Sequence, residues 1–380
     1  MRRVIKLNSE PRFLAYSAIG GLNEGRGSLG SSFDFIDNTD SFGQKTWELA
    51  EAEMSRIALN IATEKAGISH KDLDLVVSGD LQNQCVASSI GLLPFGVPSL
   101  TVYGACSTCT ESLLLASVMI EVGGAKTAAG VTTSHNLAAE RQFRSPTEYG
   151  AQRAPTSTWT ATAAGAFILT DSPDGRRTSE GIAVIEEVMI GRMIDGAITD
   201  GTNMGGAMAF AAEDTIRAYF ETSGKRPQDF DLVITGDLGR IGTDVLKELL
   251  SKELPALVPR HTDCGMLLYD YNTQDCHAGA SGCGTSASVL ASHFLPLVES
   301  GKLKDILFLS TGALMSQSSL LQGNSISGIA PLIHISHRSR EQWERDSKRR
   351  SLERAVTNDL GEPMKNETEK KIRTDEKLCR

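Results

Sequence analysis

The feature that most constrains the fold of this chain is a segment that occurs twice. Residues 47–81 contain an amphipathic helical run that ends at Gly67 and is followed by DLDLVVSGDL. The same order recurs at residues 207–238 with Gly224 and DFDLVITGDL, and the two glycines are 157 residues apart. A glycine after a helical run is typical of a helix C-terminus, and a short apolar run bounded by polar residues is typical of a buried strand. The chain is therefore predicted to contain two copies of one α/β unit.

A second pair of motifs repeats in the same way. The string GACSTCTES (104–112) leads into one apolar helical run, and GCGTSAS (282–288) leads into another. We expect two pseudo-symmetric halves, residues 1–175 and 176–336, with the functional site built from corresponding turns where the halves meet. A charged tail, residues 337–380, has little apolar area and is expected to be disordered or loosely helical.

Composition excludes several classes of protein. The net charge of −9 argues against wholesale binding to nucleic acid or to an anionic membrane surface. No apolar stretch approaches the roughly 18 residues of a transmembrane helix, and polar residues interrupt the N-terminus before a signal sequence could form. The 7 cysteines are odd in number and scattered, which suits a reducing compartment and not a disulfide framework.

Cys106 is the first candidate functional residue. It follows the strand-like SLTVY (99–103) and precedes an apolar helical run, so its sulfur is expected at a helix N-terminus, where the dipole favours the thiolate. Such a turn presents an acyl-accepting nucleophile, although a buried small residue at a tight turn is an equally open interpretation. Cys106 also forms CxxC with Cys109, but the second half has no matching CxxC, so we expect no metal site.

A polar stretch, SHNLAAERQFRSPTEYG (134–150), follows a predicted strand and is interpreted as a recognition loop. Arg141 and Arg144 could hold a carboxylate in bidentate fashion, with His135 as a further donor. The alternative is that both arginines pair with acidic side chains of the same stretch at helical spacing.

His261 is the second candidate in the C-terminal half. It lies in HTDCG (261–265), between the two repeated motifs and before the strand-like MLLYD (266–270). It could serve as a base, or it could be a structural histidine with satisfied hydrogen bonds. Cys283, in the glycine-rich GCGTSAS, completes the set of candidates.

Taken together, GACST at a strand-to-helix turn, a histidine segment and GCGTSAS in a duplicated α/β chain resemble the thiolase-like superfamily. The resemblance implies two βαβαβαββ repeats packed as a five-layered α/β/α/β/α sandwich. Longer strings over residues 43–330 resemble, more specifically, a family of sporulation proteins that bind dipicolinic acid; they include GDLQNQ (79–84), DGTNMGGAMA (200–209), TGDLGRIG (235–242) and TGALMS (311–316).

That resemblance implies a non-catalytic protein that binds dipicolinic acid or its calcium chelate. It would act in dipicolinate uptake into the developing spore and in release at germination, together with membrane proteins of the same sporulation channel. It implies a peripheral location on the cytoplasmic side of the forespore or spore inner membrane, a homodimer and no cofactor. Dipicolinate is a planar dianion, so its pocket needs positive charge or fixed donors and an apolar wall. The residues expected to bind it are Cys106, His135, Arg141, Arg144, His261 and Cys283.

Condensing enzymes of the superfamily use a Cys, His, Asn site, and this chain resembles them only in part. By this resemblance Cys106 matches the nucleophile and His261 matches the histidine, but the asparagine position is Cys283. A thiol is a weak donor, and losing one donor to the developing oxyanion costs on the order of 100–1000-fold in rate. Two alternatives remain: an acyltransferase that uses Cys106 with Cys283 as a second thiol, and an adaptor that binds membrane partners and no small molecule.

Overall fold

The computed structural model describes residues 3–143, 153–173 and 181–350. The N-terminal half forms a five-stranded sheet in the order β5-β4-β6-β8-β2. Strand β4 is parallel to β5 and β6, whereas β8 is antiparallel to both β6 and β2. The strands are β2 (Arg12–Gly20), β4 (Leu75–Gly79), β5 (Ser99–Thr101), β6 (Thr127–Ser134) and β8 (Ala163–Thr170).

The C-terminal half repeats this sheet strand for strand, in the order β12-β11-β14-β17-β9. Strand β11 is parallel to β12 and β14, and β17 is antiparallel to β14 and β9. The two sheets are joined edge to edge through β2 and β9, whose one ladder pair is Arg12 and Val184; β3 also pairs with β2, and β1 with β9. The strands are β9 (Gly181–Met189), β11 (Leu232–Thr235), β12 (His261–Asp263), β14 (Asp305–Leu309) and β17 (Leu332–Ser339). The predicted duplication is confirmed.

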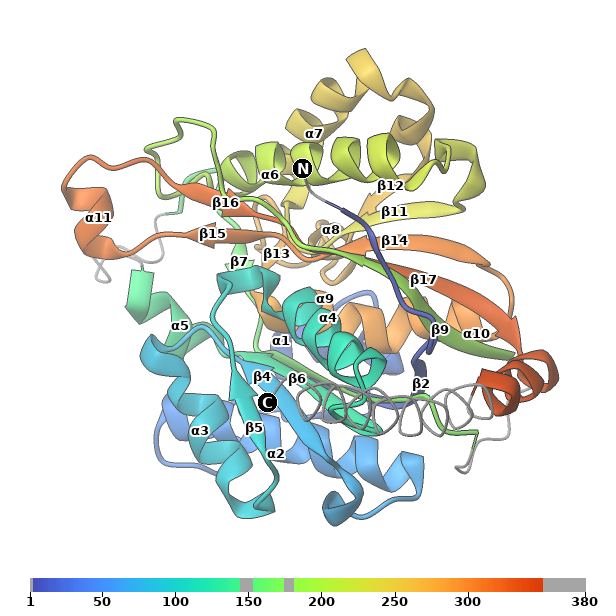
Figure 1. Ribbon diagram of the computed structural model, residues 1–380. Helices are drawn as coiled ribbons and strands as arrows, with labels where there is room; N and C mark the ends of the chain where they lie inside the picture. The colour runs from blue at the N-terminus through green and yellow to red at the C-terminus, as the bar shows by residue number, and fades with distance from the viewer. Residues whose placement is uncertain (1–2, 144–152, 174–180, 351–380) are drawn as a thin grey trace, which may run out of the picture.

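Helices complete the five layers (Figure 1). Helix α2 packs with α3 outside the first sheet, and α6 packs with α7 outside the second. Helices α4 and α9 lie between the sheets, and their apolar residues share one core with both of them. The helices are α2 (Trp47–Ala66), α3 (Val86–Leu92), α4 (Thr108–Glu121), α6 (Met204–Ser223), α7 (Gly239–Glu253) and α9 (Cys283–Val289), the last continued by a π-helical turn (Leu290–Phe294) and α10 (Leu295–Glu299).

The ends of α2 and α6 show why the repeated sequence folds twice in the same way. Thr46 caps α2 by accepting a hydrogen bond from the Leu49 amide, and Asn203 caps α6 by accepting one from the Gly206 amide. Gly67 and Gly224, at the other ends, have φ of 68° and 73°, a conformation that glycine adopts without steric cost. The helix stops predicted from the two glycines are confirmed.

Smaller elements flank the sandwich. Strands β10 (Ile194–Asp195), β15 (Gly312–Leu314) and β16 (Ser327–Ile329) form a separate three-stranded sheet, which carries α11 (Gln317–Leu321) at its tip (Figure 1). Strand β7 (Trp159–Thr160) pairs with β13 (Ala280–Ser281) and so joins the two halves. The remaining short elements are β1 (Ile5–Lys6), α1 (Leu22–Gly25), β3 (Phe35–Ile36), α5 (Asn136–Phe143) and α8 (Cys264–Leu267).

Two local expectations need correction. Asn136–Phe143, expected to be part of a loop, forms helix α5, in which Ala138 and Ala139 are fully buried. Cys264–Leu267 forms helix α8, although the sequence from residue 266 was expected to be strand-like. Both segments are short, and over so few residues an apolar run does not distinguish a helix from a strand.

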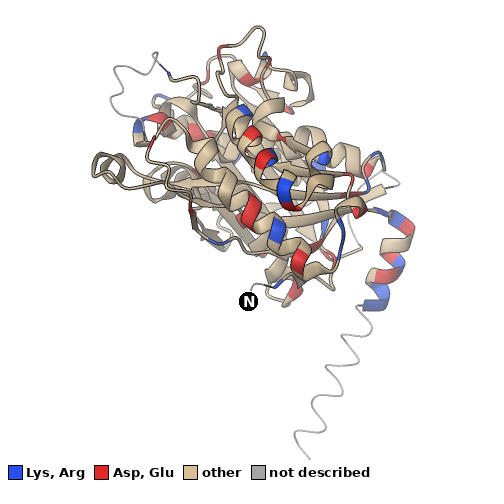
Figure 2. Cartoon of the chain, turned by 90° about the horizontal axis from the view of Figure 1, so that it is seen from above, with Lys and Arg blue, Asp and Glu red and all other residues tan. Residues whose placement is uncertain are grey.

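The first part of the predicted tail packs against the body. Strand β17 extends to Ser339, past the expected boundary at residue 337, and residues 340–350 are helical with side chains of both charge signs (Figure 2). Trp343 is 1% exposed, its indole nitrogen donates to the Glu10 carbonyl at 3.1 Å, and the Arg12 guanidinium lies 5.0 Å from its ring centre. Residues 351–380 and the expected boundary between residues 175 and 176 lie outside the described residues. In the part of the chain that the structure describes, no helix has both the length and the apolar character needed to cross a membrane.

Candidate functional site

Cys106 lies in the turn between β5 and α4, as the sequence predicts. Ala105, just before it, has φ of 52°, so the turn is sharp, and the short 3-10 turn Ala105–Ser107 leads directly into α4. Cys106 is 7% exposed. The turn therefore directs the thiol inward, toward the other half of the molecule.

Asp237, which the sequence analysis did not single out, adjoins this thiol. It follows β11, and its carboxyl group lies close enough to Cys106 for the two to interact electrostatically. The same carboxyl accepts from the Gly282 amide at 2.9 Å and from the Thr311 hydroxyl at 2.8 Å. Burial raises the pKa of Asp237 to about 7. The aspartate therefore ties the first half's thiol to two turns of the second half.

This environment disfavours the Cys106 thiolate. Burial and the neighbouring negative charge of Asp237 raise the pKa of the Cys106 thiol well above its usual value. The expectation that a helix N-terminus would favour the thiolate is thus corrected, because desolvation and a like charge outweigh the donors of one turn.

Cys283 belongs to the same buried apolar cluster as Cys106. Its thiol donates to the Thr133 carbonyl at 2.9 Å, and burial and the nearby Cys106 raise its pKa well above the usual value. Gly282 and Gly284 flank it, and a Cβ at either position would approach the Ser134 hydroxyl to 2.7 or 2.6 Å. The glycines thus allow this turn to pack directly against β6. Cys106, Asp237 and Cys283 are called the thiol site below.

His261 has a different set of neighbours. It begins β12, and its Nε2 lies 2.9 Å from the Thr235 hydroxyl, which in turn donates to Asp263 at 2.6 Å. Because the Thr235 proton is used on Asp263, Nε2 carries the ring proton, and Nδ1 is buried with no partner among the described residues. Burial, with a smaller effect of Lys247, lowers the pKa of His261 to about 3. The histidine is therefore neutral, and its hydrogen bonds do not involve the thiol site.

The candidates from residues 134–150 also have local partners. His135 is buried, its Nε2 lies 2.8 Å from the Asp40 carbonyl, and its ring stacks on Trp47. Burial lowers the pKa of His135. Arg141 is half-exposed and pairs with Glu48. Arg144 lies outside the described residues, so the clamp stays a prediction.

Two buried carboxyl groups, those of Asp80 and Glu51, lie near each other in the first half. Asp80 follows β4 as Asp237 follows β11, and it accepts from the Gln82 amide at 2.9 Å and from the Ser88 amide at 2.7 Å. Glu51 accepts from the Gln82 side chain at 2.7 Å, and burial raises the pKa of both carboxyls. The signal for Asp80 and Asp237 was present in the sequence, since each is the central residue of the repeated GDL string.

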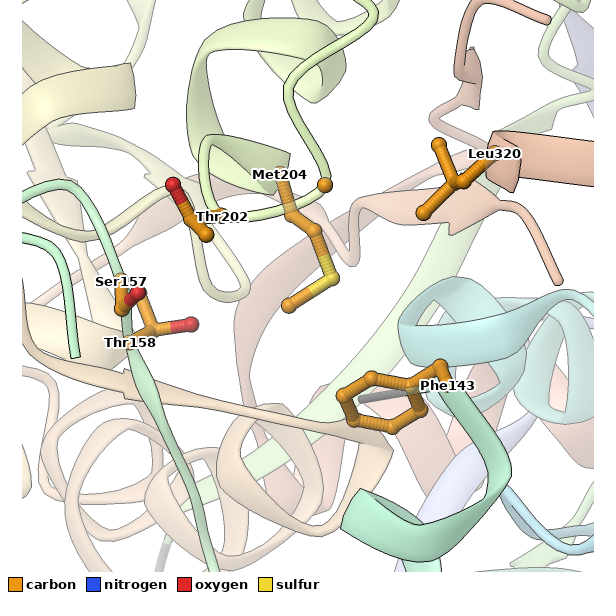
Figure 3. A pocket seen from close by; sticks show the side chains of 7 residues that line it. Phe143, Ser157, Thr158, Thr202, Met204 and Leu320 are labelled. Atoms are coloured by element: carbon orange, nitrogen blue, oxygen red, sulfur yellow. The ribbon is translucent and has the colours of Figure 1, made fainter. Parts of the chain in front are cut away.

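A cavity of about 180 Å³ lies where α5 of the first half approaches the start of α6 in the second (Figure 3). Phe143 lines it and also packs against the cluster that contains Cys106 and Cys283, so the cavity neighbours the thiol site. Its lining consists of Phe143, Ser157, Thr158, Gly201, Thr202, Met204 and Leu320.

Solved structures share the fold. One is 3-oxoacyl-[acyl-carrier-protein] synthase III from Aquifex aeolicus, with a TM-score of 0.51 and 16% identity over 85% of this chain and 99% of that one. Another is OleA from Xanthomonas campestris, with a TM-score of 0.53 and 15% identity over 86% of this chain and 98% of that one. Their likeness confirms the predicted thiolase-like fold.

Comparison of sequences is more specific. The chain is 39% identical over 310 residues to stage V sporulation protein AD of Bacillus subtilis, which covers 82% of this chain and 89% of that protein. The family model of stage V sporulation protein AD matches residues 1–336. The chain therefore belongs to the stage V sporulation protein AD family.

Proposed function

We propose that this protein binds dipicolinic acid or its calcium chelate and does not catalyse acyl condensation. In this proposal it takes part in dipicolinate uptake into the developing spore and in its release at germination. Membership of a sporulation family supports the biological setting. The state of the thiol site supports the absence of catalysis.

The observation that carries the proposal is the pairing of Cys106 with Asp237. A nucleophilic thiol is typically activated by an adjacent histidine or by a lowered pKa of its own. Here the adjacent group is a carboxyl whose charge raises the pKa of the thiol, and neutral His261 hydrogen-bonds Thr235 instead. Cys283, which donates to a backbone carbonyl, offers a weak donor in place of an amide. The acyltransferase alternative is therefore the less favoured one.

The proposal includes membrane proteins of the sporulation channel as partners and a peripheral position on the cytoplasmic side of the forespore or spore inner membrane. This part of the proposal, on partners and location, rests on family membership alone, because the contacts that would hold the protein at the membrane involve other chains. Co-purification with the channel proteins from sporulating cells would support it.

A homodimer is proposed on a specific contrast between the two halves. The edge strand β5 is exposed at all three residues, Ser99–Thr101, whereas the corresponding strand β12 is largely buried. Leu100 is 46% exposed and Leu93, nearby in the chain, is 79% exposed. A bare edge strand with apolar side chains is a template for pairing, and a second copy satisfies it about a twofold axis.

Isothermal titration calorimetry of the full chain with dipicolinate, with and without calcium, tests the binding proposal. Saturable heat near one ligand per chain is the expected result. A flat titration under both conditions would favour the adaptor alternative, in which the fold holds partners and takes no small ligand.

A further inference from the structure

An open hollow lies on the surface of the C-terminal half, where α7 begins. It has a volume of about 450 Å³ and shares no lining residue with the cavity of Figure 3. Arg240, the second residue of α7, lines one part of it, and the continuous segment 271–277 lines the rest. Arg240, Asn272, Thr273 and Asp275 are exposed to solvent. This polar, open surface differs from the enclosed and mostly apolar pockets that hold small ligands.

The side chain of Arg240 is held in place over an aromatic ring. Its guanidinium carbon lies 4.4 Å from the centre of the Tyr271 ring. Both residues are anchored on the Ala278 carbonyl, which accepts from the Arg240 backbone amide at 2.7 Å and from the Tyr271 hydroxyl at 3.0 Å. A guanidinium over a ring keeps its N–H groups available for hydrogen bonds. Arg240 is therefore positioned before any ligand arrives.

The positive charge of Arg240 is unmatched. No carboxylate among the described residues forms an ion pair with it. Asp275, the acidic residue of the lining, is already paired: its Oδ2 lies 3.0 Å from Arg153, and its Oδ1 lies 2.9 Å from the His277 Nε2. The hollow thus presents an unpaired cation on a chain whose net charge is −9.

The rim of the hollow is ordered by its own hydrogen bonds. Asp270 accepts from the Asn272 amide and from the Thr273 hydroxyl, both at 2.9 Å. The Gln274 side chain donates to the Asn23 carbonyl at 2.7 Å, which fixes the segment to the first half. A rim that is already ordered loses little conformational entropy when a partner binds.

We infer that this hollow receives an acidic side chain of a protein partner. A single guanidinium matches a single carboxylate in charge and can bind it through two parallel N–H groups. A phosphate dianion would call for a second unpaired cation, and the neighbouring guanidinium of Arg153 is already bound to Asp275. Because the hollow is open, its ligand can be carried by a large body. The inference is independent of dipicolinate binding and applies equally to the adaptor alternative.

Protection of Arg240 from phenylglyoxal, a reagent selective for arginine, tests this inference on the full chain. Peptide mass spectrometry measures the rate of modification at constant ionic strength, with the probe acetyl-Glu-Glu-Glu-amide or its uncharged match acetyl-Gln-Gln-Gln-amide. We expect the glutamate peptide at millimolar concentration to slow modification of Arg240 roughly threefold or more, and the slowing to grow with peptide concentration. The glutamine peptide should have no effect. Arg226, an exposed arginine that pairs with Asp229, is the internal control, and its rate should not change.

Two further arms sharpen the outcome. Tyr271→Leu removes the ring beneath Arg240 and keeps the charge, so the protection by the glutamate peptide should be largely lost. Sodium acetate at the same carboxylate concentration separates a free small anion from an acidic segment, and it should protect less than the peptide. No slowing at Arg240, equal slowing at Arg226, or unchanged protection in Tyr271→Leu would overturn the inference. Acetate protecting as strongly as the peptide would overturn the assignment to a protein partner.

Discussion

The thiol of Cys106 in the first half and the carboxyl of Asp237 in the second are buried neighbours that interact electrostatically across the two halves of the molecule. Cys106 follows the edge strand β5 of the first half, and Asp237 follows β11 of the second. Burial raises the pKa of both groups, and the charge of Asp237 raises that of Cys106 further, because a thiolate beside a carboxylate would place two like charges together. The Cys106 thiol is therefore held in its neutral form.

Removing the charge of Asp237 should make Cys106 more reactive. Asp237→Asn keeps an acceptor for the Gly282 amide but removes the negative charge that raises the pKa of the thiol, so more thiolate forms at a given pH. We expect Cys106 to be alkylated by iodoacetamide at pH 8 roughly threefold faster or more, since each pKa unit changes the thiolate fraction about tenfold. Peptide mass spectrometry over time measures the rate. Thr311→Val, which removes a hydrogen bond to Asp237 and keeps the charge, is the control; equal rates in wild type and Asp237→Asn would refute the explanation.

Stability should depend on pH through Glu24. Burial raises the pKa of Glu24 to about 7, from about 4.5 in the unfolded chain, although Tyr269 hydrogen-bonds it. The folded state therefore binds more protons between these values, and this group's contribution to stability falls as pH rises through that window. Between pH 5.5 and 7.5 the loss is roughly 2 kcal/mol from this group. Urea unfolding of wild type and Glu24→Gln at both pH values should show a smaller loss in the variant; parallel losses would contradict the assignment.

The edge of β5 should control the oligomeric state. Leu100→Lys places a charge on the exposed edge strand, where pairing with a second copy would bury it, so we expect a shift from dimer to monomer. Size-exclusion chromatography with light scattering measures the mass. Leu321→Lys, at a residue 80% exposed on α11, is the matched control. A wild-type monomer, or a Leu100→Lys dimer of unchanged stability, would exclude this interface.

Trp343 should stabilise the fold despite its position in the charged C-terminal segment. Trp343→Ala removes a buried indole that contacts Arg12, Ile182 and Val184, and we expect a loss of about 3–5 kcal/mol. Denaturant unfolding measures it. Arg349→Ala, at an exposed residue of the same helical segment, should change the free energy of unfolding little. A similar small effect of Trp343→Ala would show that the segment contributes nothing to the core.

The fold could be predicted from the sequence because its evidence is local and repeated. The Gly67 and Gly224 helix stops and the two copies of the GDL string each report on a neighbouring element. The approach of Cys283 to Cys106 followed from equivalent turns of the two copies. The pairing of Asp237 with Cys106 could not be predicted in this way. The two residues lie far apart in the chain, and their contact depends on which strand ends opposite the thiol.

The position of His261 illustrates the same limit. It lies between two motifs in the sequence, yet it starts β12, whereas the neighbouring strand β11 brings Asp237 to the thiol. The cavity was equally hidden, because its lining combines residues of α5 with others at the start of α6, which lie far apart in the chain. Sequence spacing identifies the turns, and three-dimensional packing decides which of their side chains meet.

Acyl transfer to Cys106 tests the central claim most directly. The protein is incubated with an acyl-coenzyme A, and the peptide that contains Cys106 is analysed by mass spectrometry, with Cys106→Ser as the control for labelling elsewhere. A neutral, buried thiol beside Asp237 predicts an unmodified peptide and no release of coenzyme A. An acyl group on Cys106 together with free coenzyme A would contradict the account and assign the protein to catalysis.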